Sequence, residues 1–144
     1  MELNVQKWCK KGIFKMLLGT YEPTLIGKNR LALPKKLRKE ISGDRLVLSV
    51  GFEECVLGFE EKKWEEVTST DLATPLSDKK GRDLRRKMFS QAEVVELDGQ
   101  GRIVVPESLI IGREFKGEIV VAGCGDHFEI WSKQKWEEYR AQMK

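Results

Sequence analysis

Two arginines that end short glycine-containing turns are the residues of this sequence with the clearest chemical potential. Arg30 closes Ile26-Gly-Lys-Asn, and Arg102 closes Asp98-Gly-Gln-Gly. An arginine at the base of a tight β-turn can enter the major groove of duplex DNA, which admits a two-stranded ribbon, and its planar guanidinium matches guanine O6 and N7. Each such contact discriminates between bases by roughly 1–3 kcal/mol. The turns therefore favour recognition of nucleic acid; the alternative is that both arginines only brace their own turns.

The residues inside the turns suit the same role. Lys28 and Gln100 occupy equivalent positions, two residues before the arginines. A lysine there suits a phosphate, and a glutamine suits a base edge or a phosphate. The glycines of the two turns permit the positive φ that tight turns require; they are Gly27, Gly99 and Gly101. We therefore predict Lys28 and Gln100 as DNA contacts.

Positive charge is concentrated in two segments, although the chain has 26 Lys+Arg against 23 Asp+Glu and a net charge of only +3. Residues 28–39 include six basic residues, among them Arg38, and no acid. Residues 79–87 include six basic residues and one acid, and begin with Lys79 and Lys80. A phosphate backbone attracts such clusters from a distance; the alternative is a solvated face. We predict DNA-backbone contacts by Arg38, Lys79 and Lys80.

The chain contains one unit twice. The segment from Met16 matches the segment from Met88, 72 residues later, and we expect this match to continue without a gap. Lys63-Trp-Glu-Glu66 recurs whole as Lys135-Trp-Glu-Glu138. The other matched pairs are Leu25/Leu97, Gly27/Gly99, Arg30/Arg102, Leu31/Ile103, Leu33/Val105, Pro34/Pro106, Leu37/Leu109, Val47/Ile119, Gly51/Gly123 and Phe59/Trp131. Chance is a poor explanation for a match that keeps glycine, proline and tryptophan together, so we infer a tandem repeat.

Propensity and alternation predict four short strands and two helices in each copy. Proline opens the first helix of each copy, since it is well tolerated at a helix start, and the second helix carries the Lys-Trp-Glu-Glu segment. Four short strands give too small a core to stand alone, so the copies should pack or interlock. The expected strands are 21–26, 30–33, 45–50 and 56–59 in the first copy, and 93–97, 102–105, 118–122 and 128–131 in the second.

These elements predict a mainly β protein with short helices. We expect an N-terminal extension at 1–15, a first domain at 16–66, a linker with a basic, helical end at 67–87, and a second domain with a C-terminal helix at 88–144. No apolar run approaches the roughly 18 residues of a membrane span, so we predict a cytoplasmic protein without a membrane partner. The tryptophans Trp64 and Trp136 are expected to be core or subunit-contact anchors.

Catalysis is poorly supported. His127 is the only histidine, and the nearby Asp126 and Glu129 suggest acid–base chemistry or a metal site. The set is not repeated in the other copy, where Cys55 aligns with His127, so we expect a structural histidine and no metal. No dinucleotide or phosphate-loop motif occurs, and we predict neither an enzyme nor a cofactor. The three separated cysteines, Cys9, Cys55 and Cys124, are interpreted as reduced thiols.

Four parts of the sequence together resemble a known family. They are Met16-Leu-Leu-Gly-Thr-Tyr21, the turn–arginine–strand–proline block, Gly123-Cys-Gly-Asp-His-Phe-Glu-Ile-Trp131 and the paired Lys-Trp-Glu-Glu segments. They look like the MraZ family of bacterial transcriptional regulators, and the resemblance covers essentially Met16 to the C-terminus. It implies two tandem SpoVT-AbrB-like swapped-hairpin units forming a pseudo-symmetric double-split β-barrel. It further implies ring-shaped homo-oligomers on the nucleoid that bind double-stranded DNA at short G-containing direct repeats and repress their own operon in the division and cell-wall cluster.

The first copy departs from the pattern that this family repeats at its turns, Asp-x-x-x-Arg. Asp98 begins the intact motif, whereas Ile26 replaces the aspartate in the first copy. A carboxylate there could accept turn N–H groups or pair with the arginine, so we expect the first turn to be less preorganised. The alternative functions are an AbrB-like antitoxin or interaction module, and single-stranded RNA binding, for which exposed aromatics beside the basic strands are missing.

Overall fold

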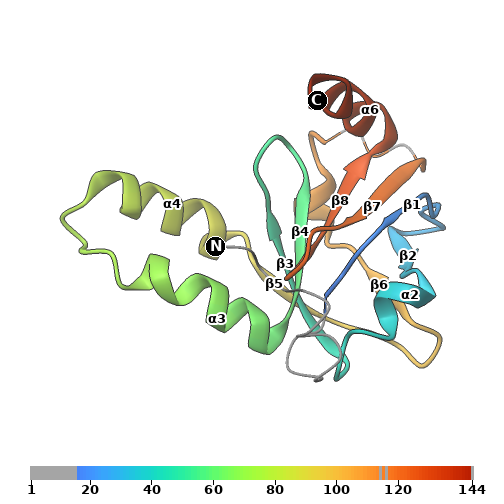
Figure 1. The fold of residues 1–144 in the computed structure, drawn as a ribbon, viewed down its shortest axis with the longest axis horizontal. Helices are drawn as coiled ribbons and strands as arrows, with labels where there is room; N and C mark the ends of the chain where they lie inside the picture. Colours follow the sequence, from blue (N-terminus) through green and yellow to red (C-terminus); the bar gives the residue numbers. More distant parts are fainter. Residues whose placement is uncertain (1–15, 114, 116, 144) are drawn as a thin grey trace, which may run out of the picture.

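The computed structural model describes residues 16–143 except 114 and 116, and it is mainly β with short helices (Figure 1). The predicted extension at 1–15, with Cys9, lies outside the described residues. The strands are β1 (Thr20–Tyr21), β2 (Arg30–Ala32), β3 (Arg45–Val50), β4 (Val56–Glu60), β5 (Glu93–Glu96), β6 (Arg102–Val104), β7 (Ile119–Gly123) and β8 (Phe128–Ser132). The helices are α2 (Lys35–Arg38), α3 (Glu61–Leu72), α4 (Lys79–Ser90), α5 (Glu107–Ile110) and α6 (Lys133–Gln142). None of the described helices is long and apolar enough to cross a membrane.

The two copies interlock through their strands. A six-stranded sheet has the order β1-β7-β8-β4-β3-β5, and β2 pairs with β6 in a separate two-stranded ribbon. All pairings are antiparallel, and exchanging the copies turns the six-strand order into its own reverse. Four of the six pairings, β1·β7, β3·β5, β4·β8 and β2·β6, join one copy to the other. The predicted pseudo-symmetric, β-barrel-like arrangement of two interlocked units is confirmed.

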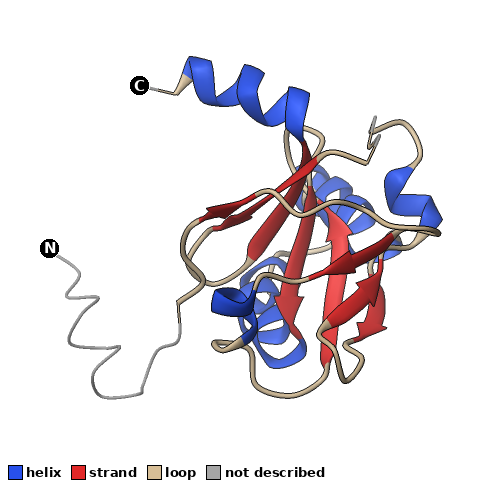
Figure 2. Ribbon diagram, turned by 90° about the vertical axis from the view of Figure 1, so that its right-hand side faces the viewer, coloured by secondary structure: helices blue, strands red, loops and turns tan. Residues whose placement is uncertain are grey.

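Apolar side chains form one core inside this arrangement and a second under the longer helices. The inner core takes equivalent residues from both copies, such as Leu31 with Ile103 and Leu37 with Leu109, all at most 1% exposed. In the outer cluster Trp64 is buried edge-on against Phe59 and Phe89. The prediction that Trp64 anchors a core is confirmed. Figure 2 shows the short helices and α6 arranged around the sheet.

The gap-free repeat predicted from the sequence is wrong by one residue in β7. Val47 of β3 lies opposite Phe59, so an uninterrupted match would place Ile119 opposite Trp131, but Val120 occupies that position. Val47 and Val120 both belong to the outer cluster, whereas Ile119 faces the inner core. A shift of one residue moves a strand side chain to the other face of the sheet, so burial reveals the insertion.

Two loops of different length absorb this shift. The connection from α5 to β7 is longer than that from α2 to β3, and the β7–β8 turn is shorter than the β3–β4 turn, which restores the match at β8. Gly123 consequently ends β7 at the position where Val50 ends β3, and the predicted equivalence of Gly51 and Gly123 is also wrong. The β3–β4 and β7–β8 turns therefore differ in length although a glycine lies near the start of both.

The segment expected to be a linker is mostly helical. Helix α3 continues beyond Trp64 to Leu72, and Thr68, one turn after Trp64, is also buried on its inner face. Only residues 73–78 connect α3 to α4. The guanidinium of Arg85 in α4 donates hydrogen bonds to the carbonyls of Asp71, Leu72 and Thr74, at 2.6–3.2 Å, and so satisfies the C-terminal end of α3. The basic helix predicted before the second copy is confirmed as α4, and Figure 1 shows that α3 and α4 project together from the sheet.

The first strand is shorter than the sequence suggests. Regular pairing covers only β1, and the later residues Thr24 and Ile26 make isolated bridges instead of a continuous strand to 26. Pro23 interrupts the segment, since proline has no N–H to donate to a neighbouring strand. In the second copy, which has no proline there, the strand predicted at 93–97 forms as β5.

The central pairing of β4 with β8 departs from symmetry in its side chains. Val56 lies opposite Ile130, and Gly58 lies opposite Phe128. A Cβ atom added to Gly58 would collide with the fully buried Phe128 ring. The missing side chain on one strand therefore leaves the volume that the phenylalanine of the other strand fills.

Gly58→Ala should destabilise the fold without changing the turns that end at Arg30 and Arg102. Overpacking a dense core costs about 1–3 kcal/mol, because the Phe128 ring must shift. Urea unfolding measures the loss. Gly99→Ala is the matched control, since a Cβ there meets nothing within 4 Å. Equal stability of the Gly58 variant and the unchanged protein would contradict this packing account.

Candidate nucleic-acid interface

The two predicted arginines lie on the same face of the ribbon formed by β2 and β6. Arg30 is opposite Val104, and Arg102 is opposite Ala32. Leu31 and Ile103, between them, are buried against the inner core at no more than 1% exposure, so the alternate residues face outward. Diagonal neighbours on such a ribbon stand about 7–8 Å apart at the backbone. The ribbon thus places one guanidinium from each copy side by side on its outer surface.

Both turns are tied to the ribbon by a repeated pair of backbone hydrogen bonds. The Leu33 N–H donates to Gly101 O at 3.0 Å, and the Val105 N–H donates to Asn29 O at 2.9 Å. Each bond joins the turn of one copy to the strand end of the other. The position and direction of the arginines therefore depend on the interlocked fold and not on each hairpin alone.

The second turn is organised by the carboxylate of Asp98. Its Oδ1 accepts the N–H groups of Gln100 at 2.8 Å and Arg102 at 2.9 Å, and its Oδ2 accepts Nε of Arg102 at 2.9 Å. The hydrogen bond from the backbone N–H of Arg102 contributes most to holding the pKa of Asp98 below its usual range. Burial opposes this lowering, and the Arg102 side chain and the Gln100 N–H add to it. Both roles expected of this carboxylate, accepting turn N–H groups and pairing with the arginine, are confirmed.

The first turn closes without a carboxylate. The Arg30 N–H donates to Ile26 O at 3.0 Å, and Asn29 takes a positive φ of 59° at the position where Gly101 has 77°. Arg30 is exposed, and its side chain makes no hydrogen bond or ion pair with any residue in the described part of the chain. The side chain of Arg102, by contrast, is 38% exposed and bound to Asp98. The two arginines therefore differ in preorganisation, as the loss of the aspartate at Ile26 predicts.

Each turn is also braced by the short helix of the opposite copy. Arg38 of α2 donates from Nη1 to Gln100 O at 2.5 Å, and Asn29 donates from Nδ2 to Glu107 Oε2 of α5 at 2.9 Å. Gly101 takes a positive φ of 77°, which favours glycine, and a Cβ added there would also displace the flexible Arg38 side chain from the turn. Sequence reasoning missed this cross-bracing because residues so far apart in the chain carry no pairing signal.

The contacts between each turn and the helix of the opposite copy bring basic residues of the first copy to the second turn, and an acidic residue of the second copy to the first turn. The exposed cations of the first copy, Lys35, Lys36 and Lys39, belong to the segment whose Arg38 contacts the second turn. The first turn has its own Lys28 and Arg30, both exposed, but faces the acidic Glu107. Neither turn is sealed inside the protomer. Of the predicted site residues, Lys28, Arg30, Arg38, Gln100 and Arg102 are therefore brought together at the ribbon, on the turns that Gly27, Asp98, Gly99 and Gly101 form.

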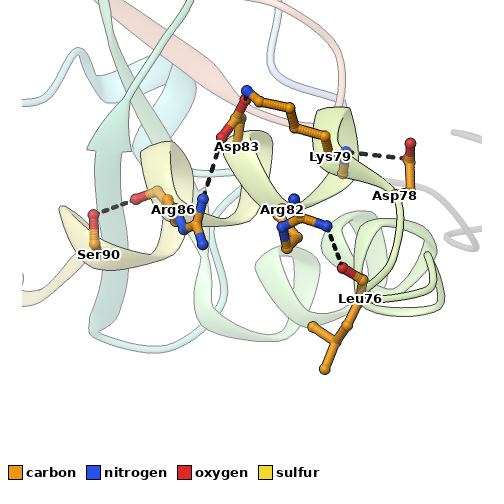
Figure 3. A network of polar contacts seen from close by, with 8 residues as sticks. Leu76, Asp78, Lys79, Arg82, Asp83, Arg86 and Ser90 are labelled. Atoms are coloured by element: carbon orange, nitrogen blue, oxygen red, sulfur yellow. Dashed lines mark hydrogen bonds and ion pairs between the residues drawn. The ribbon is translucent and has the colours of Figure 1, made fainter.

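Lys79 and Lys80 are placed elsewhere. They begin α4 at the tip of the α3–α4 hairpin, which Figure 1 shows at the opposite end of the molecule from β2, β6 and α2. Lys79 Nζ lies 2.7 Å from Asp83 Oδ2, and Asp83 also pairs with Arg86 at 3.4 Å (Figure 3). Lys80 is exposed. The structure thus does not bring these two lysines to the ribbon, and their contact with DNA stays a separate prediction.

The histidine considered as a catalytic candidate lies in a polar cluster at the β7–β8 turn. His127 Nδ1 is 2.7 Å from Asp126 Oδ1, and Nε2 is 3.1 Å from Glu129 Oε2. Burial opposes the charged imidazole, but hydrogen bonds to Cys124, Glu129 and Asp126 outweigh it and raise the pKa of His127 to about 10. Cys55, at the equivalent turn, is buried in the outer cluster, and this burial raises the pKa of its thiol. The two turns therefore share no common constellation.

Replacing Asp98 should loosen the second turn selectively. In Asp98→Ala the amides of Gln100 and Arg102 lose their acceptor, and since a hydrogen bond contributes about 1 kcal/mol net, their hydrogen exchange should accelerate about fivefold. NMR-detected amide exchange measures this. The amide of Arg30, which bonds to a carbonyl oxygen, is the internal control and should not change. Unaltered exchange at both second-turn amides would show that the carboxylate does not organise the turn.

Comparison with known proteins identifies the family of the chain. The model of the MraZ protein family, a family described as antitoxin-like, matches residues 16–87 and again 88–144. Proteins named transcriptional regulator MraZ are 38% identical in Roseiflexus castenholzii over 128 residues, which is 89% of each chain, and 37% identical in Clostridium acetobutylicum over 124 residues, which is 86% of this chain and 87% of that one. A third, from Roseiflexus sp., is 36% identical over 128 residues and 89% of each chain. The chain belongs to the MraZ family, whose relatives are named as transcriptional regulators.

Proposed function

We propose that this protein is a transcriptional regulator that binds specific sequences in double-stranded DNA through the β2·β6 ribbon. The observation that supports this most is the position of Arg30 and Arg102, which come from different copies and lie on one outward face of a two-stranded ribbon. The relatives named as transcriptional regulators support the same class of function.

The ribbon suits the major groove physically. A two-stranded antiparallel ribbon is narrow enough to enter that groove, where each base pair presents a distinct pattern of donors and acceptors. Arg102, held by Asp98 through Nε, keeps its terminal nitrogens available to pair with guanine O6 and N7. Arg30 would use the same chemistry from a less restrained side chain. Gln100 would reach a base edge or a phosphate from the tip of its turn.

The surrounding cations support phosphate contacts. Lys28 on the first turn and Lys35, Lys36 and Lys39 around α2 are all exposed. Such contacts fix the register of a protein on the duplex and supply affinity that falls as salt rises, without reading the sequence. Arg38 would contribute indirectly, because its hydrogen bond to Gln100 O holds the second turn.

One protomer contacts few base pairs, so we further propose that the protein acts as a ring-shaped homo-oligomer on repeated sites. Linked binding modules raise avidity by orders of magnitude on correctly spaced repeats. Family resemblance suggests short G-containing direct repeats upstream of the protein's own operon, in the division and cell-wall cluster, with repression as the outcome and the cytoplasmic nucleoid as the location. Several regularly spaced G-containing repeats immediately upstream of the gene would support this part.

An antitoxin is the second candidate, because the matching family is described as antitoxin-like. Both functions would use the same ribbon to hold DNA. They differ in whether the protein also neutralises a toxin. Growth of cells that lack only this protein separates them, since loss of an antitoxin is toxic whereas loss of a repressor raises transcription of its operon.

Arg30→Ala and Arg102→Ala should each weaken binding to the upstream repeats by about 5- to 150-fold, the range equivalent to 1–3 kcal/mol per base contact. Each variant loses a side chain that faces solvent, so its far-UV spectrum and assembly size should not change. Fluorescence anisotropy with repeat and scrambled duplexes measures the effect, and Arg140→Ala on α6, also exposed, is the matched control.

The same assay separates base reading from phosphate contact. Replacing Lys79 and Lys80 together by Gln should weaken binding to repeat and scrambled duplexes alike and reduce the salt slope, if these lysines contact phosphates. Wild-type affinity of either arginine variant for the repeats would refute the assignment of that arginine. A loss confined to the repeats in the lysine variant would contradict the phosphate role.

A further inference from the structure

A mixed set of sulfur, nitrogen and oxygen donors converges at the turn between β7 and β8. One donor atom each from Cys124, His127 and Glu129 lies within 4.8 Å of the other two. The Nε2–Oε2 separation of 3.1 Å between His127 and Glu129 is close to the spacing of two ligands on one tetrahedral ion, whose bonds are about 2.0–2.1 Å long. The thiol of Cys124 is exposed, and the other two side chains are about one-fifth exposed.

The groups behind these donors are arranged as supporting partners of a metal site. Asp126 Oδ1 lies 2.7 Å from Nδ1 of His127, which directs Nε2 toward Glu129. Trp131 Nε1 donates to Glu129 Oε1 at 3.0 Å, so Oε2 is the carboxylate oxygen that faces Nε2 of His127, and a metal ion bound between them would replace the proton that these two atoms share. Carboxylate–histidine pairing of this kind fixes the tautomer and orientation of metal-binding imidazoles.

The cluster is also held rigidly. The imidazole stacks on Phe59 of β4 with ring centroids 4.9 Å apart. The Cys124 N–H donates to His127 O at 2.8 Å, and Gly125 exchanges two backbone hydrogen bonds with Leu17, at 2.8 and 2.9 Å. The donors are thus preorganised by the sheet and by the incoming N-terminal segment, which lowers the entropy cost of collecting them on an ion.

We propose that Cys124, His127 and Glu129 form a zinc site with one open coordination position. Thiolate, imidazole and carboxylate together suit Zn²⁺ better than hard cations, which prefer oxygen ligands alone, and three protein ligands leave the fourth position for water or an outside group. Asp126 is a positioning residue that orients His127. This site is separate from the β2·β6 ribbon and does not depend on the proposed DNA binding, and it revises the expectation of a purely structural histidine.

Titration of the metal-free full-length protein with Co²⁺ tests the proposal. Cobalt substitutes for zinc in such sites, and its bond to a thiolate produces a charge-transfer absorption that oxygen and nitrogen ligands alone do not give. We expect this band to saturate at one ion per chain and to disappear on addition of Zn²⁺. A Cys9→Ser background ensures that the signal reports Cys124, because Cys55 is buried.

Variants assign the ligands. Cys124→Ser should abolish the band, and His127→Gln and Glu129→Gln should each lower affinity by at least about 100-fold; Asp126→Asn should lower it by about 10- to 100-fold, the usual effect of removing a supporting carboxylate. Glu53→Gln, an exposed acid in the equivalent turn of the first copy, is the matched control and should bind as the unchanged protein does.

Far-UV spectra of all variants establish that they are folded, and the exposure of Cys124 makes its replacement the least disruptive. Absence of a thiolate–cobalt band in the folded Cys9→Ser protein would overturn the proposal. So would a band that persists at full strength in Cys124→Ser. Wild-type affinity in Asp126→Asn would overturn the positioning role given to that carboxylate.

Discussion

Pairing between the two copies of the repeat is the constraint on which the rest of the structure depends. Neither copy has enough strands to enclose an inner core, so β2 pairs with β6, and β4 with β8, across the repeat boundary. These pairings bury Leu31 and Ile103 and turn the alternate residues Arg30 and Arg102 outward. The surface that we propose for DNA binding is therefore formed by both copies together, and no single hairpin contains it.

The two copies have diverged while keeping this constraint. Asp98 organises the second turn, whereas the first turn depends on its backbone and on the contact of Asn29 with Glu107. Gly58 provides the space that Phe128 fills. Such complementary changes preserve the interlocked scaffold, because a side chain missing from one copy is compensated by a side chain of the other copy. They also give the protein two unequal arginine turns and one polar cluster, at the β7–β8 turn, that has no counterpart in the first copy.

Much of this organisation could be predicted from the sequence, since turns, prolines and the Lys-Trp-Glu-Glu segments recur in order. The register of β7 could not be predicted, because consecutive apolar residues such as Val120 and Val121 fit a buried strand equally well after a shift of one position. The α3–α4 hairpin was missed for another reason. The end of α3 contains Thr68-Ser-Thr70 and the connection contains Pro75, which are residue types typical of turns and loops. The Arg85 side chain that caps α3 is too far away in the sequence for local patterns to reveal this contact. Convergence of Cys124 with His127 likewise requires the turn geometry.

Hydrogen-exchange mass spectrometry of the protein with and without its upstream DNA tests the central claim most directly. If the ribbon enters the groove, exchange should slow in residues 26–33 and 98–105, which contain both turns and both strands, while the tip of the α3–α4 hairpin should change far less. Slowed exchange at the α3–α4 tip, with the ribbon unaffected by saturating DNA, would contradict the account.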